Sequence, residues 1–280
     1  VGREALALDE CDAWARHAVA HVLEMNGRAA EGAAWLGASA ERWKHTNNFG
    51  LHLYWHQALF LLELGRRDEV LGLYDQFIRA KPSDDFRDIA NASALLARLE
   101  FEGVSVGGRW DELGEAAARR IDDRALVFAD LHYALALAGA GRSADAERLG
   151  ASLMVRGAEG DRYDDSVAQS VGISVAEAIT AFRRGDHAMA AKLMWAVRAK
   201  MPTIGGSNAQ RDLFEQLLIE SLMRAGDYDR AETVLRRRLG ERGGRNAFAA
   251  SRLRRLADPA GIRYRLGRLI TASMPLAAVH

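Results

Sequence analysis

A glycine followed five residues later by a small residue recurs along this chain and constrains its fold more than any other pattern. Clear copies are Gly27/Gly32, Gly141/Ala146, Gly185/Ala190 and Gly226/Ala231, with Gly65/Val70 as a looser one. Successive glycines lie 38, 76, 44 and 41 residues apart, and because 76 is twice 38 we expect a degenerate unit near Gly103. Self-similarity at this period indicates a repeat protein in which each unit packs on its neighbours.

The clearest unit runs from Ala58 to Pro82. An apolar stretch ends at Gly65, an amphipathic stretch follows, and Pro82 ends it, which predicts two helices joined by a glycine turn. The same reasoning predicts six helix pairs and two capping helices. They cover residues 12–26/29–41, 50–64/67–80, 84–101/109–121, 124–140/143–156, 165–184/187–200 and 209–225/228–240, with caps at 245–257 and 259–272.

The order of small residue, glycine, acidic pair, aromatic and proline in this unit resembles the tetratricopeptide repeat. The resemblance implies an all-α, tetratricopeptide-like α-solenoid of about six helix pairs with C-terminal capping helices. We expect one helical-repeat domain over 1–280, with repeats over about 12–241 and the cap over about 245–272. The repeat also predicts buried alanines at four helix crossings, namely Ala20, Ala58, Ala134 and Ala178.

The charge balance argues against nucleic-acid and membrane partners. Lysine plus arginine equals aspartate plus glutamate at 38 each, and no apolar run approaches the roughly 18–20 residues of a membrane span. The single cysteine, Cys11, excludes an internal disulfide and suits a reducing compartment. We therefore expect a cytoplasmic protein, although the chain begins with Val1 and an upstream segment could precede it.

Two pairs of histidines with four-residue spacing indicate a polar site. His17/His21 and His52/His56 each lie on one helical face. In the tetratricopeptide register these histidines point into the concave groove, together with Glu24, Trp55 and the His132 of Asp130-Leu-His132. We expect His21 and His56 to lie close enough to share an ion or ligand atom, because adjacent helix axes pack about 8–10 Å apart.

Three chemistries fit this cluster. A divalent metal accepts neutral imidazoles at this spacing, which makes His17, His21, His52 and His56 candidate metal ligands. Imidazoles oriented by Glu24 or Asp130 could instead serve in acid–base catalysis or anion recognition without a metal. The third interpretation is a structural hydrogen-bonded network. The candidate catalytic residues are His17, His21, Glu24, His52, His56, Asp130 and His132, and whether the chain is an enzyme stays open.

A second group of residues is a candidate ligand site. The turn before Gln210 contains two glycines and begins a helix, where free N–H groups and Arg211 would attract an anion. The alternative is an ordinary capped helix start. Two tryptophans are candidate ligand platforms rather than core anchors, one by groove position and one by its place at a loop edge. The candidate ligand-binding residues are Trp55, Trp110, Ser207, Gln210, Arg211 and Asp212.

Several motifs together resemble the tetratricopeptide repeat protein 38 family. The segments that carry the resemblance are His17–Met25, His52–Leu59, Tyr74–Asp75, Asp130–His132 and Gly205–Asp212. It covers the chain from about Asp12 to Leu239. The resemblance implies a helical-repeat fold with polar residues gathered at a shared pocket, and it fixes no reaction.

The sequence thus predicts a His-rich concave pocket that binds a small polar or anionic molecule. Chemical transformation of that molecule and a divalent metal are both left open. The alternative function is a non-catalytic scaffold that takes a peptide or protein partner along an open groove. Apolar groove residues of the fifth unit, Val175, Ala176 and Ile179, favour a localised pocket over such a groove.

Overall fold

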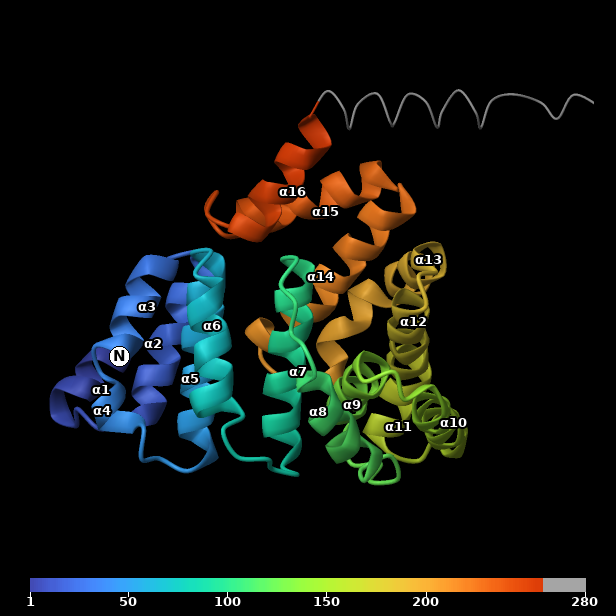
Figure 1. Cartoon of the computed structure of the whole chain (residues 1–280), viewed down its shortest axis with the longest axis horizontal. Helices are drawn as coiled ribbons and strands as arrows, with labels where there is room; N and C mark the ends of the chain where they lie inside the picture. The colour runs from blue at the N-terminus through green and yellow to red at the C-terminus, as the bar shows by residue number, and fades with distance from the viewer. Residues whose placement is uncertain (259–280) are drawn as a thin grey trace, which may run out of the picture.

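The computed structural model describes residues 1–258, and every regular element in that part of the chain is a helix (Figure 1). This confirms the all-α class. The predicted second capping helix, 259–272, lies outside the described residues. Within residues 1–258, no helix combines the length and the apolar character needed to cross a bilayer.

Six helices make up the N-terminal part of the molecule. They are α1 (Gly2–Leu8), α2 (Ala13–Met25), α3 (Ala29–Gly37), α4 (Ala40–Trp43), α5 (Asn48–Glu63) and α6 (Arg67–Leu73). A π-helical segment, Tyr74–Ile78, continues α6. The short helices α1 and α4 are absent from the sequence prediction.

The middle of the chain continues the alternation of helices and turns. Its helices are α7 (Phe86–Phe101), α8 (Arg109–Ala118), α9 (Val127–Gly139), α10 (Ser143–Glu159), α11 (Tyr163–Val167), α12 (Ile173–Arg183) and α13 (His187–Val197). A π-helical segment, Ala168–Gly172, separates α11 from α12, so the helix predicted over 165–184 is irregular near its start. A 3₁₀ helix, Arg198–Ile204, follows α13.

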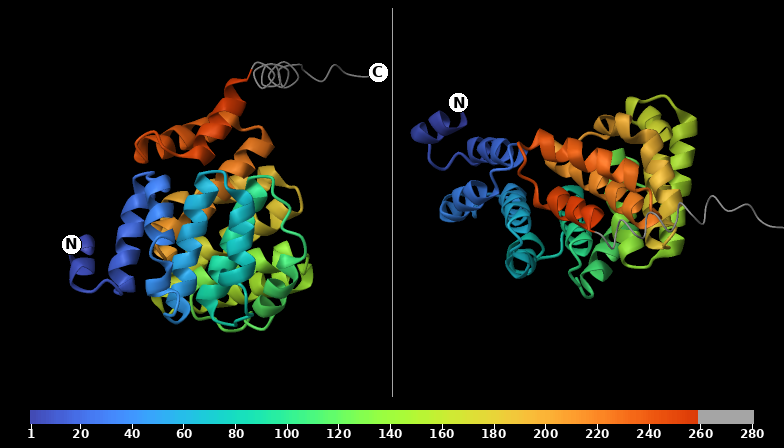
Figure 2. Two further views of the ribbon diagram at one scale, coloured as in Figure 1. Left: turned by 60° about the vertical axis from the view of Figure 1, so that its left-hand side comes forward. Right: turned by 90° about the horizontal axis from the view of Figure 1, so that it is seen from above.

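The described chain ends with α14 (Asn208–Ala225), α15 (Tyr228–Glu241) and α16 (Ala247–Ala257). In the right-hand view of Figure 2, α2 to α13 follow a curved path, called the arc below. Figure 1 shows α14 inside the arc and α15 and α16, in orange and red, across one end of it. Helix α14 contacts both α2 and α7.

Turn glycines and crossing alanines occupy the expected places. The glycines at the ends of first helices adopt positive φ angles between 63° and 84°, which favour glycine at a helix end. They are Gly27, Gly65, Gly103, Gly141, Gly185 and Gly226. Ala20, Ala58, Ala134 and Ala178 are all buried. The predicted burial of these alanines and the predicted turn near Gly103 are confirmed.

Specific polar contacts join the last helices to the first ones. The buried Arg98 of α7 donates a hydrogen bond to the carbonyl of Ala209 in α14 at 2.7 Å. The Glu63 carboxylate at the end of α5 accepts one from the first backbone N–H of α16, that of Ala247. A Cβ on Gly27 would lie 2.3 Å from the carbonyl oxygen of Arg245, so the turn after α2 lies close against the loop between α15 and α16. Helix α14 therefore covers part of the inner face, and α16 is fixed across one end of the arc.

Candidate metal centre

Helices α2 and α5 lie side by side and carry the same pattern, an aromatic residue, a histidine three positions later and a second histidine four positions after that. Each residue of the set Phe49, His52 and His56 follows its counterpart in Trp14, His17 and His21 by 35 residues. The two rings of each pair contact each other across the helices, with centroids 4.1, 4.9 and 4.5 Å apart in chain order.

Asp12 and Asn47 determine where these two helices begin. The Asp12 side chain accepts a hydrogen bond from the N–H of Ala15, and that of Asn47 accepts one from Phe49. Such caps satisfy N–H groups that a helix start leaves unpaired. Because the caps also lie 35 residues apart, the two histidine-bearing faces start in register.

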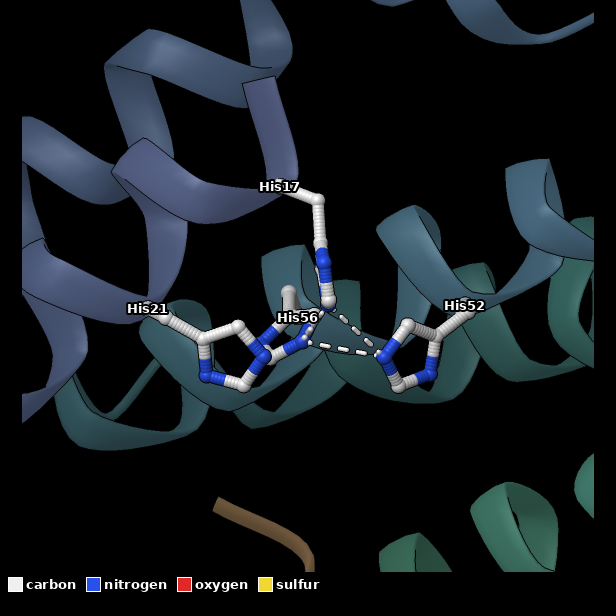
Figure 3. A group of neighbouring side chains, drawn as sticks. All are labelled: His17, His21, His52 and His56. Atoms are coloured by element: carbon white, nitrogen blue, oxygen red, sulfur yellow. Dashed lines mark hydrogen bonds between the residues drawn. The ribbon is translucent and has the colours of Figure 1, made fainter. Parts of the chain in front are cut away.

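The four histidines converge on one point. The Nε2 atom of His17 lies 3.1 Å from that of His56 and 3.1 Å from that of His52, and the last two atoms are 3.2 Å apart. Figure 3 shows the His21 ring directing a nitrogen at the other three. One nitrogen from each ring lies within 4.8 Å of the others. The predicted meeting of the two histidine pairs is confirmed.

Three Nε2 atoms this close together are better satisfied by a shared cation than by hydrogen bonds to one another. A neutral imidazole offers one N–H donor and one acceptor nitrogen. When three Nε2 atoms face a common centre, hydrogen bonds cannot satisfy all three contacts, because lone pairs or hydrogens then oppose each other. A cation at that centre accepts every lone pair at once.

The surroundings keep these imidazoles neutral. Burial, together with His52 and His21, lowers the pKa of His17 to about 3. Burial and His21 lower the pKa of His52 to about 4, and a side-chain hydrogen bond with Asn91 acts in the opposite direction. Burial also lowers the pKa of His21 and, with the other three rings, that of the fully buried His56. At neutral pH a metal therefore has no protons to displace from these nitrogens.

Glu24 lies one helical turn beyond His21 but belongs to a different network. Its carboxylate is 3.7 Å from the guanidinium of Arg242. Burial and the nearby Asp212 raise the pKa of Glu24. Although burial opposes ionisation of Asp212, Arg238 and Arg242 hold the pKa of this carboxyl far below its usual range. The structure thus places Glu24 and Asp212 in an ion network between α2, α14 and α15.

Asp130 and His132 also lie apart from the four histidines. Asp130 pairs with the buried Arg156 at 3.0 Å, and burial raises its pKa to about 7. His132 Nδ1 lies 2.7 Å from the carbonyl oxygen of Phe128, its ring packs against Phe214, and burial lowers its pKa to about 4. Because Asp130 and His132 are two residues apart on α9, they point to different sides of the helix.

The two candidate tryptophan platforms are buried. Trp55 is covered completely and stacks on His52 at a ring-centroid distance of 5.3 Å. Trp110 is almost fully covered, and its indole N–H donates to Glu100 at 2.9 Å. Neither ring presents a face to solvent, so Trp55 supports the His52 ring and Trp110 anchors α8 against the core.

The polar groups of the segment before α14 form hydrogen bonds with one another and with the start of the helix. Ser207 and Gln210 form a capping box, in which each side chain accepts a hydrogen bond from the other's backbone N–H. Arg211 donates to the carbonyl oxygens of Gly205, at 3.1 Å, and Gly206. A capped helix start accounts for these contacts, and an anion-binding role for Arg211 stays a prediction.

Some candidate residues line a cleft of about 750 Å³ between α13, α14, α15 and the end of α2. Glu24, Arg211 and Asp212 contribute to its wall, next to Trp195. The four histidines do not line this cleft. The sequence-predicted site therefore divides into a histidine centre and a separate charged cleft.

Sequence reasoning missed three residues around the centre. Trp14 and Phe49 form the outermost pair of rings, and the 35-residue offset between the two helices would have revealed them. Arg98, whose guanidinium lies 5.7 Å from the centre of the Trp55 ring, has no such signal, because its role depends on the distant Ala209.

No model of a known protein family matches this chain, and no solved structure matches it significantly.

Proposed function

We propose that this chain is a tetratricopeptide-like helical-repeat protein, related to the tetratricopeptide repeat protein 38 family, whose histidine centre binds a divalent transition metal. In this proposal the metal serves the binding of a small polar or anionic molecule. The observation that carries it is the triangle of Nε2 atoms of His17, His52 and His56, with edges of 3.1, 3.1 and 3.2 Å.

The size of the triangle fits a tetrahedral metal site. With zinc–nitrogen bonds of about 2.0–2.1 Å, two ligand nitrogens in a tetrahedral site lie about 3.3–3.4 Å apart. The observed edges are within about 0.3 Å of that separation, a difference that small ring rotations absorb. A nitrogen of His21 lies within 4.8 Å of the other three.

The donor set selects the kind of metal. All four candidate ligands are imidazoles, which suit zinc, copper, nickel or iron, whereas magnesium and calcium prefer oxygen ligands. A tetrahedral arrangement of nitrogen donors favours zinc among these. We therefore propose Zn²⁺ as the resident ion.

The closed shape of the molecule favours a localised pocket over an open peptide groove. Helix α14 occupies the inner side of the arc and α16 lies across one end of it, and Arg98 and Glu63 tie these two helices to α7 and α5. An extended peptide would have to displace these contacts. A small ligand reaching the half-buried histidines would not.

Metal analysis of gently purified protein tests the proposal. We expect one zinc ion per chain in the wild type. His17→Ala and His52→Ala should weaken zinc binding by more than the roughly 10–100-fold that changes to outer-shell partners cost. Isothermal titration of metal-free protein with Zn²⁺ measures this directly.

His45→Ala is the matched control, because His45 is an exposed histidine on the loop between α4 and α5. It should bind zinc as the wild type does. Helical circular dichroism should be retained in all variants. Wild-type protein that takes up no zinc, nickel, copper or cobalt would show that the four histidines form a structural network instead.

A further inference from the structure

The four histidines of the centre are not equivalent. The three contacts at hydrogen-bond distance join His17, His52 and His56. Among the described residues, the His21 ring makes no such contact with the other three, although its nitrogen lies within 4.8 Å of theirs. The geometry therefore indicates three candidate ligands close together and a fourth ring that lies farther away.

A set of three protein ligands leaves a coordination position for solvent or substrate. This arrangement distinguishes zinc sites that do chemistry from closed, four-ligand structural sites. The candidate metal-ligating group contains imidazoles only, which bind a metal in their neutral form. A divalent ion held by them keeps its full double positive charge, so an anion in the open position is strongly favoured.

An exposed aromatic surface lies one helical turn from His17 and His52. Trp14 is 69% exposed and stacks on Phe49 with a centroid distance of 4.1 Å. Phe49 in turn packs edge-on against His17 at 5.1 Å and lies 6.1 Å from His52. Trp14 is the one exposed tryptophan of the six in this chain, all of which are described. A large apolar ring ordered by stacking but left open to solvent, next to candidate metal ligands, is a surface on which a ligand can lie.

We propose that His17, His52 and His56 hold the metal permanently, and that its fourth position exchanges and takes an oxyanion attached to a flat apolar group, which lies on Trp14 and Phe49. Aryl carboxylates and aryl hydroxamates have this chemistry. The inference rests on the proposed metal function and names the ligand class of the same site. His21 lies beside the exchanging position, where it can hydrogen-bond to the bound water or oxyanion.

Cobalt-loaded protein provides the test, because the visible spectrum of Co²⁺ reports on its ligands. We would titrate it with acetohydroxamate and with benzohydroxamate, which share the metal-binding group and differ in the flat ring. We expect both to change the spectrum, and benzohydroxamate to bind about tenfold more tightly. Trp14→Ala should reduce that preference to less than about threefold and leave cobalt affinity unchanged.

Two further variants complete the design. Tyr163→Ala removes an aromatic residue that is equally exposed but lies on α11, and it should keep the tenfold preference. His21→Ala should retain cobalt within about tenfold of the wild type, whereas His52→Ala should lose it. Loss of cobalt from His21→Ala as severe as that from His52→Ala would make His21 a fourth ligand and overturn the inference.

The outcomes separate this inference from the function on which it depends. If wild-type protein takes up no metal, both fail. If it takes up cobalt but neither hydroxamate changes the spectrum, the centre is closed and only this inference fails. If the wild type and Trp14→Ala each bind the two hydroxamates equally tightly, the aromatic surface is likewise excluded as a binding element.

Discussion

At the scale of single residues, the main property of the centre is that its four imidazoles are uncharged. Its histidines are surrounded by one another and by aromatic rings, and no carboxylate belongs to the metal-ligating group among residues 1–258. Burial therefore works against protonation at each ring. A metal-free protein must keep four imidazoles uncharged and tightly packed, and this makes its stability depend on pH.

We predict that metal-free protein loses stability as the pH falls from about 6.5 to 4. The pKa of His52 is about 4 in the folded chain, below its ordinary value of 6.5. The unfolded chain therefore binds the proton first, and acid favours unfolding until the folded state is protonated too. His52 alone should account for about 3 kcal/mol of this loss.

Urea denaturation in the presence of a chelator, repeated across this pH range, measures the effect. His52→Gln removes the titrating group and should flatten the pH dependence by that amount, whereas His45→Ala should leave it unchanged. Identical slopes for the wild type and His52→Gln would contradict the proposed neutrality of the buried ring.

At the scale of helices, the site depends on the register between α2 and α5. Helix α3 helps to hold that register, because Gly32 packs directly on the ring of Phe60 in α5. A Cβ at Gly32 would lie 2.3 Å from that ring. Small changes in α3 are therefore transmitted to the helix that carries His52 and His56.

We predict that Gly32→Ala lowers the free energy of unfolding by about 1–3 kcal/mol, the usual cost of overpacking. Gly150→Ala is the matched control on α10, where an added Cβ would meet no atom of the described chain within 4 Å. It should raise stability by about 0.5–1 kcal/mol, because alanine favours a helix over glycine. Chemical denaturation compares the two, and a stabilising Gly32→Ala would show that α3 does not pack on α5 as described.

Much of the helical layout is predictable from the sequence, because glycine turns, caps and apolar spacing act locally. Gly103 and Ala178 are examples, because residues a few positions away are enough to indicate a glycine turn or a buried alanine. The partners of charged groups are not predictable in this way. Asp130 pairs with Arg156, 26 residues away, and Arg98 reaches Ala209, 111 residues away. Nothing near Asp130 indicates that its carboxylate binds an arginine instead of orienting His132.

At the scale of the whole molecule, buried arginines close the arc. Arg252 of α16 donates to the carbonyl of Phe101 at 2.7 Å and pairs with Glu102 and Glu220, at 2.6 and 2.8 Å. These contacts attach α16 to the end of α7 and to α14. The histidine centre contacts none of them, because its ligands all belong to α2 and α5.

We predict that Arg252→Ala loosens the closure without disturbing the centre. Removing Arg252 takes away the buried partner of Glu220, which among the described residues keeps only Arg224 at 3.2 Å, and breaking such a buried pair costs about 3–5 kcal/mol. Backbone amides of α16 should exchange hydrogen at least tenfold faster in mass-spectrometric measurements, while zinc affinity stays within about twofold. A parallel loss of zinc affinity would mean that the closure and the centre fold as one unit.

The position of the four histidines in the chain has a consequence for biosynthesis. All of them lie between residues 17 and 56, whereas the contacts that close the arc need residues beyond 200, which are made later. A nascent chain folds from its N-terminal end as it emerges. In the proposed metal function, the histidines therefore capture the ion before the helices that close the arc are translated. Metal supply would then act at the ribosome, before α14 enters the arc.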